Sequence, residues 1–121
     1  MAHRVLVVDD DLNILQLFAR ILSKAGHEVH TEQSGGSVLE TIRMAGPFDL
    51  LILDLCMPGV DGFDVLRLVS SQHLGMKVLV ISGFVNGKLL PAAECLGATE
   101  TLPKSDAPRL LLSRVNRLLE V

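Results

Sequence analysis

Short runs of consecutive apolar residues recur along the chain and predict buried β-strands. These runs cover residues 5–8, 50–53 and 78–81, and a weaker one covers residues 99–102. Continuous apolar runs are typical of strands that helices cover on both faces, as in a parallel sheet. Residues 27–31 instead alternate polar and apolar side chains, which indicates a strand at the edge of that sheet.

Apolar residues at helical spacing fill the intervals between these runs. Each interval places them on one face, as expected for a helix that packs against a sheet. The faces are formed by Leu15, Phe18, Ala19 and Leu22, by Leu39 and Ile42, by Phe63, Leu66 and either Val69 or Ser70, by Leu89, Ala93 and Leu96, and by Leu111, Val115 and Leu118.

Acidic, proline and glycine residues indicate how the last two helices begin. Asp106 is placed to cap the last helix, with Pro108 in its first turn. The fourth helix contains Pro91 and follows Gly83 and Gly87, so we expect that region to be mobile.

Strands and helices therefore alternate as (βα)5, and no linker or repeat divides the chain. Its 121 residues suit one domain, which we place at residues 1–121. The alternation favours an α/β fold with a doubly wound parallel sheet and right-handed crossovers. In the strand order 2-1-3-4-5, ligands bind outside the carboxyl ends of the strands, where the first and third strands are neighbours.

Polar residues directly follow four of the predicted strands. Asp9 and Asp10 follow the first strand, Asp54 the third and Ser82 the fourth, and Lys104 comes just after the fifth. Because the carboxyl ends of parallel strands meet at one edge of a sheet, we expect carboxylates, a hydroxyl and an ammonium group to converge there.

The carboxylates of Asp9, Asp10 and Asp54 would repel one another unless a cation lay among them. Hard oxygen ligands with few His or Cys nearby favour Mg2+ over zinc. Mg2+ also keeps several of its waters, so two or three carboxylates suffice to hold it. Asp11 has a simpler role, because it is placed to cap the first helix.

Asp54 could act as a nucleophile toward phosphorus. A carboxylate that attacks a phosphoryl group forms an acyl phosphate, and the reaction needs neutralisation of the phosphoryl oxygens. Mg2+ would hold one oxygen, Lys104 a second, and the Ser82 hydroxyl with the Gly83 N–H a third. Lys104 alone would be an ordinary surface lysine and Ser82 alone a turn residue, so the hypothesis depends on their joint placement.

These residues resemble those of two-component response-regulator receiver domains. The resemblance lies in residues 7–11, 53–62, 81–83 and 103–104, and it extends over essentially the whole chain. Residues 54–62 read D-x-x-M-P-x-x-D-G. It implies a flavodoxin-like fold with the strand order given above.

The resemblance also implies a role for each matching residue. Asp54 would be the phosphorylation site. Asp10 would bind Mg2+ directly and Asp9 mainly through water, and the main-chain carbonyl of Cys56 would be a further metal ligand. Ser82 and Lys104 would grip the phosphoryl group.

Members of this family take the phosphoryl group from a sensor histidine kinase, a histidine phosphotransfer protein or a small phosphodonor. By resemblance, this chain would be a phosphoacceptor switch rather than an enzyme with a free substrate. It would signal to a downstream effector or a fused output domain through its last two helices, where Arg109, Arg114 and Arg117 are candidates for salt links. Dimerisation on phosphorylation is an open alternative.

Four positions depart from the usual receiver pattern. Thr101 stands where Tyr or Phe is usual, so a rotating aromatic ring cannot couple the hydroxyl residue to the output. Ser105 replaces a common proline whose preceding bond is cis. Cys56 and Phe84 flank the expected path of the attacking water and orient water poorly, which predicts slow self-dephosphorylation.

Composition and charge narrow the class of partner. A net charge of -3 and the absence of Trp and Tyr argue against direct binding of nucleic acid. The apolar runs are too short to cross a membrane, and we expect no signal peptide. Cys56 and Cys95 form no metal or redox motif, so we expect a cytoplasmic setting, with Cys95 a small buried residue.

Three other classes of protein could share this frame. A pseudo-receiver, which takes no phosphate, would not need the full set of acceptor residues found here. A small aspartyl-phosphate phosphatase usually has a second Asp two residues after the nucleophile, where Cys56 stands. A flavin-binding protein needs a phosphate loop after the first strand, where residues 9–11 are all acidic and would repel a phosphate.

Overall fold

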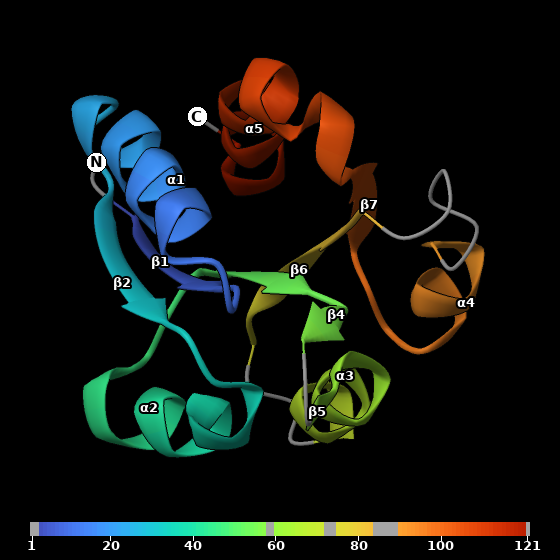
Figure 1. Ribbon diagram of the computed structural model, residues 1–121. Coiled ribbons are helices and arrows are strands. Elements are labelled where there is room, and N and C mark those ends of the chain that lie inside the picture. Colours follow the sequence, from blue (N-terminus) through green and yellow to red (C-terminus); the bar gives the residue numbers. More distant parts are fainter. Residues whose placement is uncertain (1–2, 58–59, 72–74, 84–89, 121) are drawn as a thin grey trace.

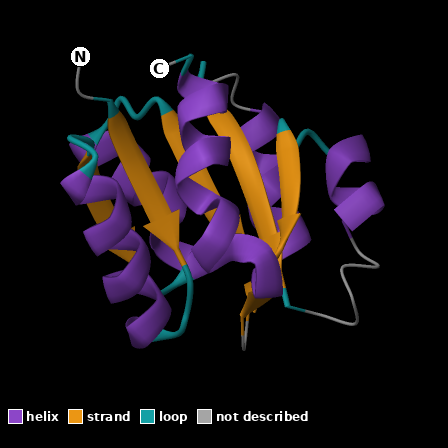
Figure 2. Ribbon diagram, turned by 90° about the horizontal axis from the view of Figure 1, so that it is seen from above, coloured by secondary structure: helices purple, strands orange, loops and turns teal. Residues whose placement is uncertain are grey.

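The predicted parallel sheet is present in the computed structural model, which describes residues 3–57, 60–71, 75–83 and 90–120. Its strands are β1 (Arg4–Val8), β2 (Glu28–Glu32), β3 (Leu50–Asp54), β6 (Lys77–Ser82) and β7 (Glu100–Pro103). They run parallel in the order β2-β1-β3-β6-β7, which confirms the predicted order 2-1-3-4-5. Each strand begins and ends within one residue of its predicted position. Figure 2 shows the strands side by side and pointing the same way.

Helices cover both faces of this sheet (Figure 1). They are α1 (Leu12–Lys24), α2 (Val38–Ala45), α3 (Gly62–Ser71), α4 (Leu90–Cys95) and α5 (Ala107–Leu119). The helices α1 and α5 pack on one face, and α2 and α3 pack on the other. Two 3-10 turns, η1 (Gly35–Ser37) and η3 (Lys104–Asp106), precede α2 and α5. The fold is thus the three-layered flavodoxin-like α/β architecture expected from the sequence. In the part of the chain that the structure describes, no helix is long and apolar enough to span a membrane.

The central strands are buried on both sides, which explains their unbroken apolar runs. Successive side chains of a strand point to opposite faces, so each run supplies both layers of the core. Leu6, Val8, Leu51, Leu53, Val78 and Val80 face α2 and α3, whereas Val5, Val7, Leu50, Ile52, Leu79 and Ile81 face α1 and α5. The strand β2 lies at the edge and is partly exposed along its length, as its alternating pattern predicted.

The predicted helix starts are only partly confirmed. Asp11 is the N-cap of α1 and accepts a hydrogen bond from the Asn13 N–H at 2.9 Å. Asp106 occupies the N-cap position of α5, but its carboxylate accepts from Arg109 and caps no backbone N–H, so the predicted capping bond is wrong. Pro91 lies in the first turn of α4, where its missing N–H breaks no helical hydrogen bond.

Around α4, two of the residues that the sequence singled out lie outside the described chain, and a third is exposed. Gly87 and Leu89, which we associated with a mobile segment and a helix face, lie outside the described residues. Cys95 is exposed rather than buried. The physical reason is that α4 is short and turns Ala93 toward the core, which leaves Cys95 on its outer side.

A small hairpin that the sequence did not predict links β3 to α3. It consists of β4 (Cys56–Met57) paired antiparallel with β5 (Val60–Asp61). The chain then returns so closely to β3 that a Cβ on Gly62 would lie 2.5 Å from the Leu55 Cα and 2.6 Å from its carbonyl oxygen. Glycine is therefore required at position 62 to let the chain after the hairpin pass the backbone that follows Asp54.

We predict that Gly62→Ala lowers the free energy of unfolding by roughly 1–3 kcal/mol, the scale of overpacking in a tight site. Urea denaturation measures this change. Gly36→Ala is a matched control, because a Cβ at Gly36 would meet only the Ser34 Oγ, at an ordinary 3.6 Å. A Gly62→Ala protein as stable as Gly36→Ala would show that the close approach to Leu55 relaxes at no cost.

Candidate functional site

The strand register brings the predicted polar residues to one edge of the sheet. Val8 pairs with Leu53, so the next residues, Asp9 and Asp54, are neighbours. On the other side of β3, Asp54 pairs with Ile81, and Ser82 ends that strand. Ser82 in turn pairs with Pro103, the residue before Lys104. Four of the predicted site residues, Asp9, Asp54, Ser82 and Lys104, thus lie at the carboxyl ends of four different strands.

Lys104 bridges two buried carboxylates at this edge. Its Nζ lies 2.9 Å from the Asp9 Oδ2 and 3.2 Å from the Asp54 Oδ2. The Asp9 and Asp54 side chains are only 3% and 2% exposed. Carboxylates with so little access to water need a cation or hydrogen-bond donors beside them, and Lys104 supplies both.

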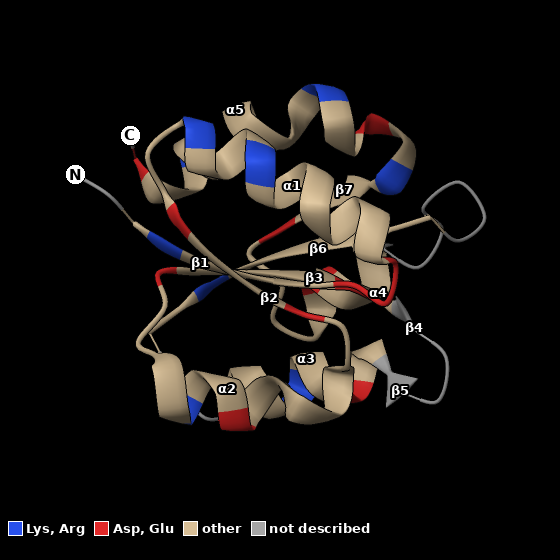
Figure 3. Ribbon diagram, turned by 60° about the vertical axis from the view of Figure 1, so that its left-hand side comes forward, with Lys and Arg blue, Asp and Glu red and all other residues tan. Residues whose placement is uncertain are grey.

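The second oxygen of Asp9 is also held by the protein. Its Oδ1 accepts a hydrogen bond from the Asp11 N–H at 2.9 Å, where the chain turns into α1. Asp10 lies between these two residues and is exposed. Asp9 is therefore fixed by protein donors at both oxygens, whereas the carboxylate of the neighbouring Asp10 is exposed to solution. Figure 3 shows this acidic turn after β1, together with the basic residues on α1 and α5.

Asp9, Asp10 and Asp54 have the geometry of a cation site. One carboxylate oxygen from each lies within 4.8 Å of the others, and no other such group of His, Cys, Asp or Glu occurs among the described residues. Three carboxylates beside one ammonium leave two negative charges, which a divalent cation would balance. The oxygen-only ligand set, part buried and part exposed, fits a hard ion that keeps some of its waters, as Mg2+ does.

The surroundings of Lys104 keep its amine charged. Burial favours the neutral amine and by itself would lower the pKa of Lys104. The hydrogen bond to Asp9 and the charges of Asp54 and Asp9 together outweigh burial, and they raise the pKa above its usual value. Lys104 is therefore a permanent positive charge at neutral pH, next to the oxygen that we expect to react.

The last residue of β6 and the residue that follows it complete this edge. Ser82 is 1% exposed at the end of the strand. A Cβ added to Gly83 would lie 3.3 Å from the Lys104 Cδ, so the lysine stem passes close over this glycine. The small residue at position 83 leaves room for the lysine to reach across to Asp54 and Asp9.

Three further residues were singled out for the site: Cys56, Phe84 and Ser105. The backbone of Cys56 lies in β4, and the predicted role of its carbonyl as a metal ligand stays a prediction. Phe84 lies outside the described residues. Lys104 and Ser105 are joined by a trans peptide bond. Within the described residues, the cis bond is the one between Gly46 and Pro47.

The sequence analysis did not predict how β7 is linked to α5. Arg114 and Arg117 both pair with the Glu100 carboxylate, at 3.0 Å for Arg114. These arginines thus have partners within the chain, as does Arg109 in its pair with Asp106. Residues 14 and 17 positions apart cannot be paired from periodicity alone, so no sequence signal identified the Glu100 links.

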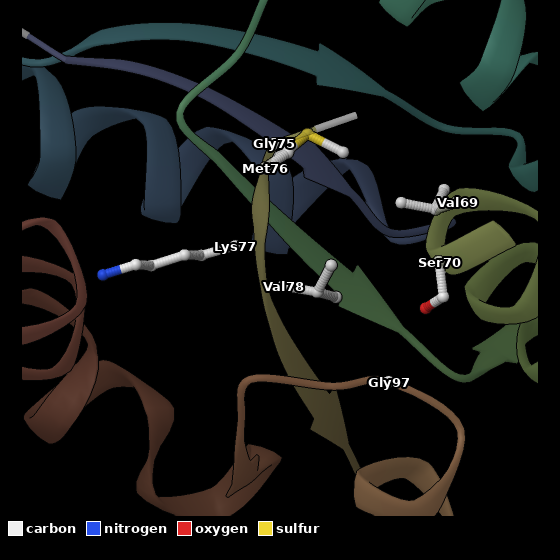
Figure 4. Close-up of a pocket in the computed structure, with 7 residues that line it drawn as sticks. All are labelled: Val69, Ser70, Gly75, Met76, Lys77, Val78 and Gly97. Atoms are coloured by element: carbon white, nitrogen blue, oxygen red, sulfur yellow. The ribbon is translucent and has the colours of Figure 1, made fainter. Parts of the chain in front are cut away.

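A pocket of about 460 Å³ (Figure 4) lies where β6 begins, and Ser82 is at the other end of that strand. Val69 and Ser70 of α3, Val78 of β6 and Gly97 line it. Lys77 also borders this pocket, but its side chain extends toward α5, where Nζ donates to the Leu118 carbonyl. None of the predicted site residues lines this pocket, so its size does not mark it as the functional site.

Comparison with known proteins identifies relatives along almost the whole chain. The model of the response regulator receiver domain matches residues 5–116. Response regulator MprA of Mycobacterium ulcerans is 36% identical over 119 residues, which are 98% of this chain and 51% of that protein. MprA of Mycobacterium bovis is 35% identical over the same lengths. The chain thus spans about half the length of the curated relatives it matches.

Solved structures give the same result. NtrX from Brucella abortus superposes with a TM-score of 0.90 at 34% identity, over 99% of this chain and 27% of that one. The BeF3-activated receiver domain of DrrB, a Thermotoga maritima protein, gives 0.86 at 27% identity and covers both chains fully. A CheY-like receiver domain protein from Methanospirillum hungatei gives 0.88 at 29% identity, over 99% of this chain and 96% of that one.

Proposed function

Because this chain belongs to the response regulator receiver family, we propose that its Asp54 accepts a phosphoryl group and that the domain, residues 1–121, relays this event as a change of shape. The observation that supports Asp54 most is its buried carboxylate, which lies 3.2 Å from the Lys104 Nζ within the three-acid cluster. A nucleophile, a fixed positive charge and a set of cation ligands are thus within reach of one another.

Each residue has a definite part in the proposed reaction. A carboxylate oxygen of Asp54 forms the new bond to phosphorus, while the bond from phosphorus to the donor breaks and the donor leaves with the electron pair. Lys104 neutralises one phosphoryl oxygen, and the hydroxyl of Ser82 donates to another. Asp9, Asp10, Asp54 and the Cys56 carbonyl would hold Mg2+, which when bound supplies positive charge to the remaining phosphoryl oxygen.

A small phosphodonor tests this proposal without knowledge of the kinase. We predict that phosphoramidate with Mg2+ adds one phosphoryl group to the intact protein, and that the same donor with EDTA adds none within the same time. Intact-protein mass spectrometry measures the gain. A pseudo-receiver would show no gain in mass with Mg2+. An equal gain in mass in the presence of EDTA would argue against a metal-dependent site.

The wider role follows from the same proposal. The donor in the cell would be a sensor histidine kinase or a histidine phosphotransfer protein, and the signal would pass to an effector or to an output domain. We place the reaction in the cytoplasm. The domain would turn over no free substrate and would make no direct contact with nucleic acid. Both a monomer and a dimer that forms on phosphorylation are compatible with this role.

We predict that the phosphorylated form loses its phosphoryl group slowly. Cys56 stands at a position beside the expected path of the hydrolytic water and orients water poorly, so Cys56→Asn should speed the loss about ten-fold, the scale of one added hydrogen bond. Timed mass spectra after removal of the donor measure the rate. Cys95→Asn is the control, because Cys95 is an exposed residue of α4. Equal rates in all three proteins would argue that Cys56 does not limit hydrolysis.

A further inference from the structure

Two histidines lie side by side where β1 and β2 begin. His3 precedes β1 and His27 precedes β2, and the Glu28 N–H donates to the His3 carbonyl at 2.9 Å. Arg4 pairs with Glu28, so the residues before them are neighbours whose side chains point to the same face of the sheet. The centres of the two imidazole rings are 5.9 Å apart, with a tilt of 53° between the ring planes. The rings are therefore within reach of a common ligand.

Each of these rings has a buried nitrogen without a partner. Within the part of the chain that the structure describes, the Nδ1 atoms of His3 and His27 are buried and make no hydrogen bond. His27 as a whole is 6% exposed. A buried polar atom that makes no hydrogen bond costs free energy. Such an atom in a folded protein indicates a ligand, which can be a water or an ion.

A residue of α5 fixes the orientation of the His27 ring. The His27 Nε2 lies 3.2 Å from the Asn116 Oδ1. An amide oxygen only accepts hydrogen bonds, so Nε2 carries the proton and the lone pair of the neutral ring is on Nδ1. Histidines that bind metal ions commonly donate their other ring N–H to an oxygen in this way, which holds the ring in place. His27 is therefore oriented to bind a cation through Nδ1.

The spacing of the two rings fits a single ion between them. A zinc–nitrogen bond of about 2.0–2.1 Å places the ion about 3.2 Å from the centre of each imidazole ring. Two rings around one ion then have centres roughly 5.2 Å apart at a tetrahedral angle and roughly 6.4 Å apart on a straight line. The observed 5.9 Å lies between these limits.

Water would complete the coordination of such an ion. No third His, Cys, Asp or Glu among the described residues lies close enough to join the pair. A pocket of about 240 Å³ beside His3, lined also by Asp49 and Glu120, has room for water. Lys77 lines this pocket too, but its Nζ donates to the Leu118 carbonyl, and the two carboxylates outweigh its charge.

We propose that His3 and His27 bind a divalent transition-metal ion such as Zn2+ through their Nδ1 atoms. Imidazole nitrogens suit zinc, copper and nickel, whereas Mg2+ prefers oxygen ligands such as those of the acidic cluster. His3 and Asp9 are six residues apart along β1, which is about 20 Å in an extended strand. This histidine site is therefore separate from the acidic cluster and does not depend on the proposed function. A bound ion would join the starts of β1 and β2 and stabilise the fold.

A Zn2+ titration in excess Mg2+, followed by NMR of the histidine ring C–H signals, tests the proposal. The signals of His3 and His27 should shift together with a dissociation constant of about 1–200 µM, which corresponds to half the binding free energy of a four-ligand zinc site. The ring signals of His30 should not move, because its Nε2 already lies 2.8 Å from the Glu28 carboxylate.

His27→Gln is the variant of choice, because its amide can still donate to Asn116 while Nδ1 is lost. It should weaken Zn2+ binding at least about ten-fold, whereas His30→Gln, the matched control, should bind as the wild type does. His3→Gln changes a less buried residue and should have the effect of His27→Gln, which keeps the test valid if His27→Gln folds poorly. In urea denaturation, Zn2+ at a hundred times the dissociation constant should raise the ratio of folded to unfolded wild type about 100-fold.

Three results would overturn the histidine site. The ring signals of His3 and His27 could ignore millimolar Zn2+, which would indicate that a water occupies the space between them. Equal Zn2+ affinity in the wild type, His3→Gln and His27→Gln would mean that the ion is bound elsewhere, and equal weakening in His30→Gln would mean that binding is not specific to this pair. Each of these results would leave the phosphoacceptor role of Asp54 standing, because no residue of the acidic cluster takes part.

Discussion

Asp54→Asn should abolish phosphorylation by phosphoramidate in the presence of Mg2+. The amide cannot act as the attacking oxygen, and the substitution also removes one of the three acids of the proposed cation site. We expect the rate to fall by at least about 10³-fold, below detection by intact-protein mass spectrometry, in line with the loss of a nucleophile. Mg2+ affinity measured by calorimetry should fall in the same variant.

The control for this prediction is Asp64→Asn. Asp64 is an exposed acid of α3 that pairs with Arg67, so its loss should leave phosphorylation at the wild-type rate. Phosphorylation of Asp54→Asn at the wild-type rate would mean that a different carboxylate accepts the group. Peptide mapping would then distinguish Asp10, the exposed member of the cluster, from the remaining acids.

Lys104→Met should slow phosphorylation by about 10²–10³-fold, the usual cost of losing one charge that stabilises developing negative charge. It should also destabilise the metal-free protein by about 3–5 kcal/mol, because the buried carboxylates of Asp9 and Asp54 lose their cationic partner. Mg2+ should restore much of that stability in the variant, since a divalent ion can replace the missing charge. Urea denaturation with and without Mg2+ measures both effects.

Lys77→Met is a matched comparison for this second prediction. Lys77 is also partly buried, but its Nζ donates to the Leu118 carbonyl at the other end of the sheet. Its loss should cost stability that Mg2+ does not restore and should leave phosphorylation intact. If Mg2+ stabilises Lys104→Met no more than Lys77→Met, then Lys104 is not the cation that balances the acidic cluster.

The sheet was predictable from local pattern because burial on both faces requires unbroken apolar runs. The runs at β1, β3 and β6 have this property, and the alternating β2 shows its edge position just as directly. The β4–β5 hairpin was not predicted, since strands of two residues carry no measurable period. The exposure of Cys95 was also missed, because a short apolar stretch does not reveal which side of a six-residue helix faces inward.

The candidate site, like the fold, was predictable from the sequence only in part. The sequence by itself determined which polar residues end the strands, since a parallel sheet sends every carboxyl end to one edge, and this is enough to bring Asp9, Asp54, Ser82 and Lys104 together. Only the tertiary structure decided which atoms pair: that Lys104 spans both buried acids, and that His27 reaches Asn116. These contacts depend on strand register and helix placement to within about an ångström. Their partners are too far apart along the chain for a local sequence pattern to predict the pairing.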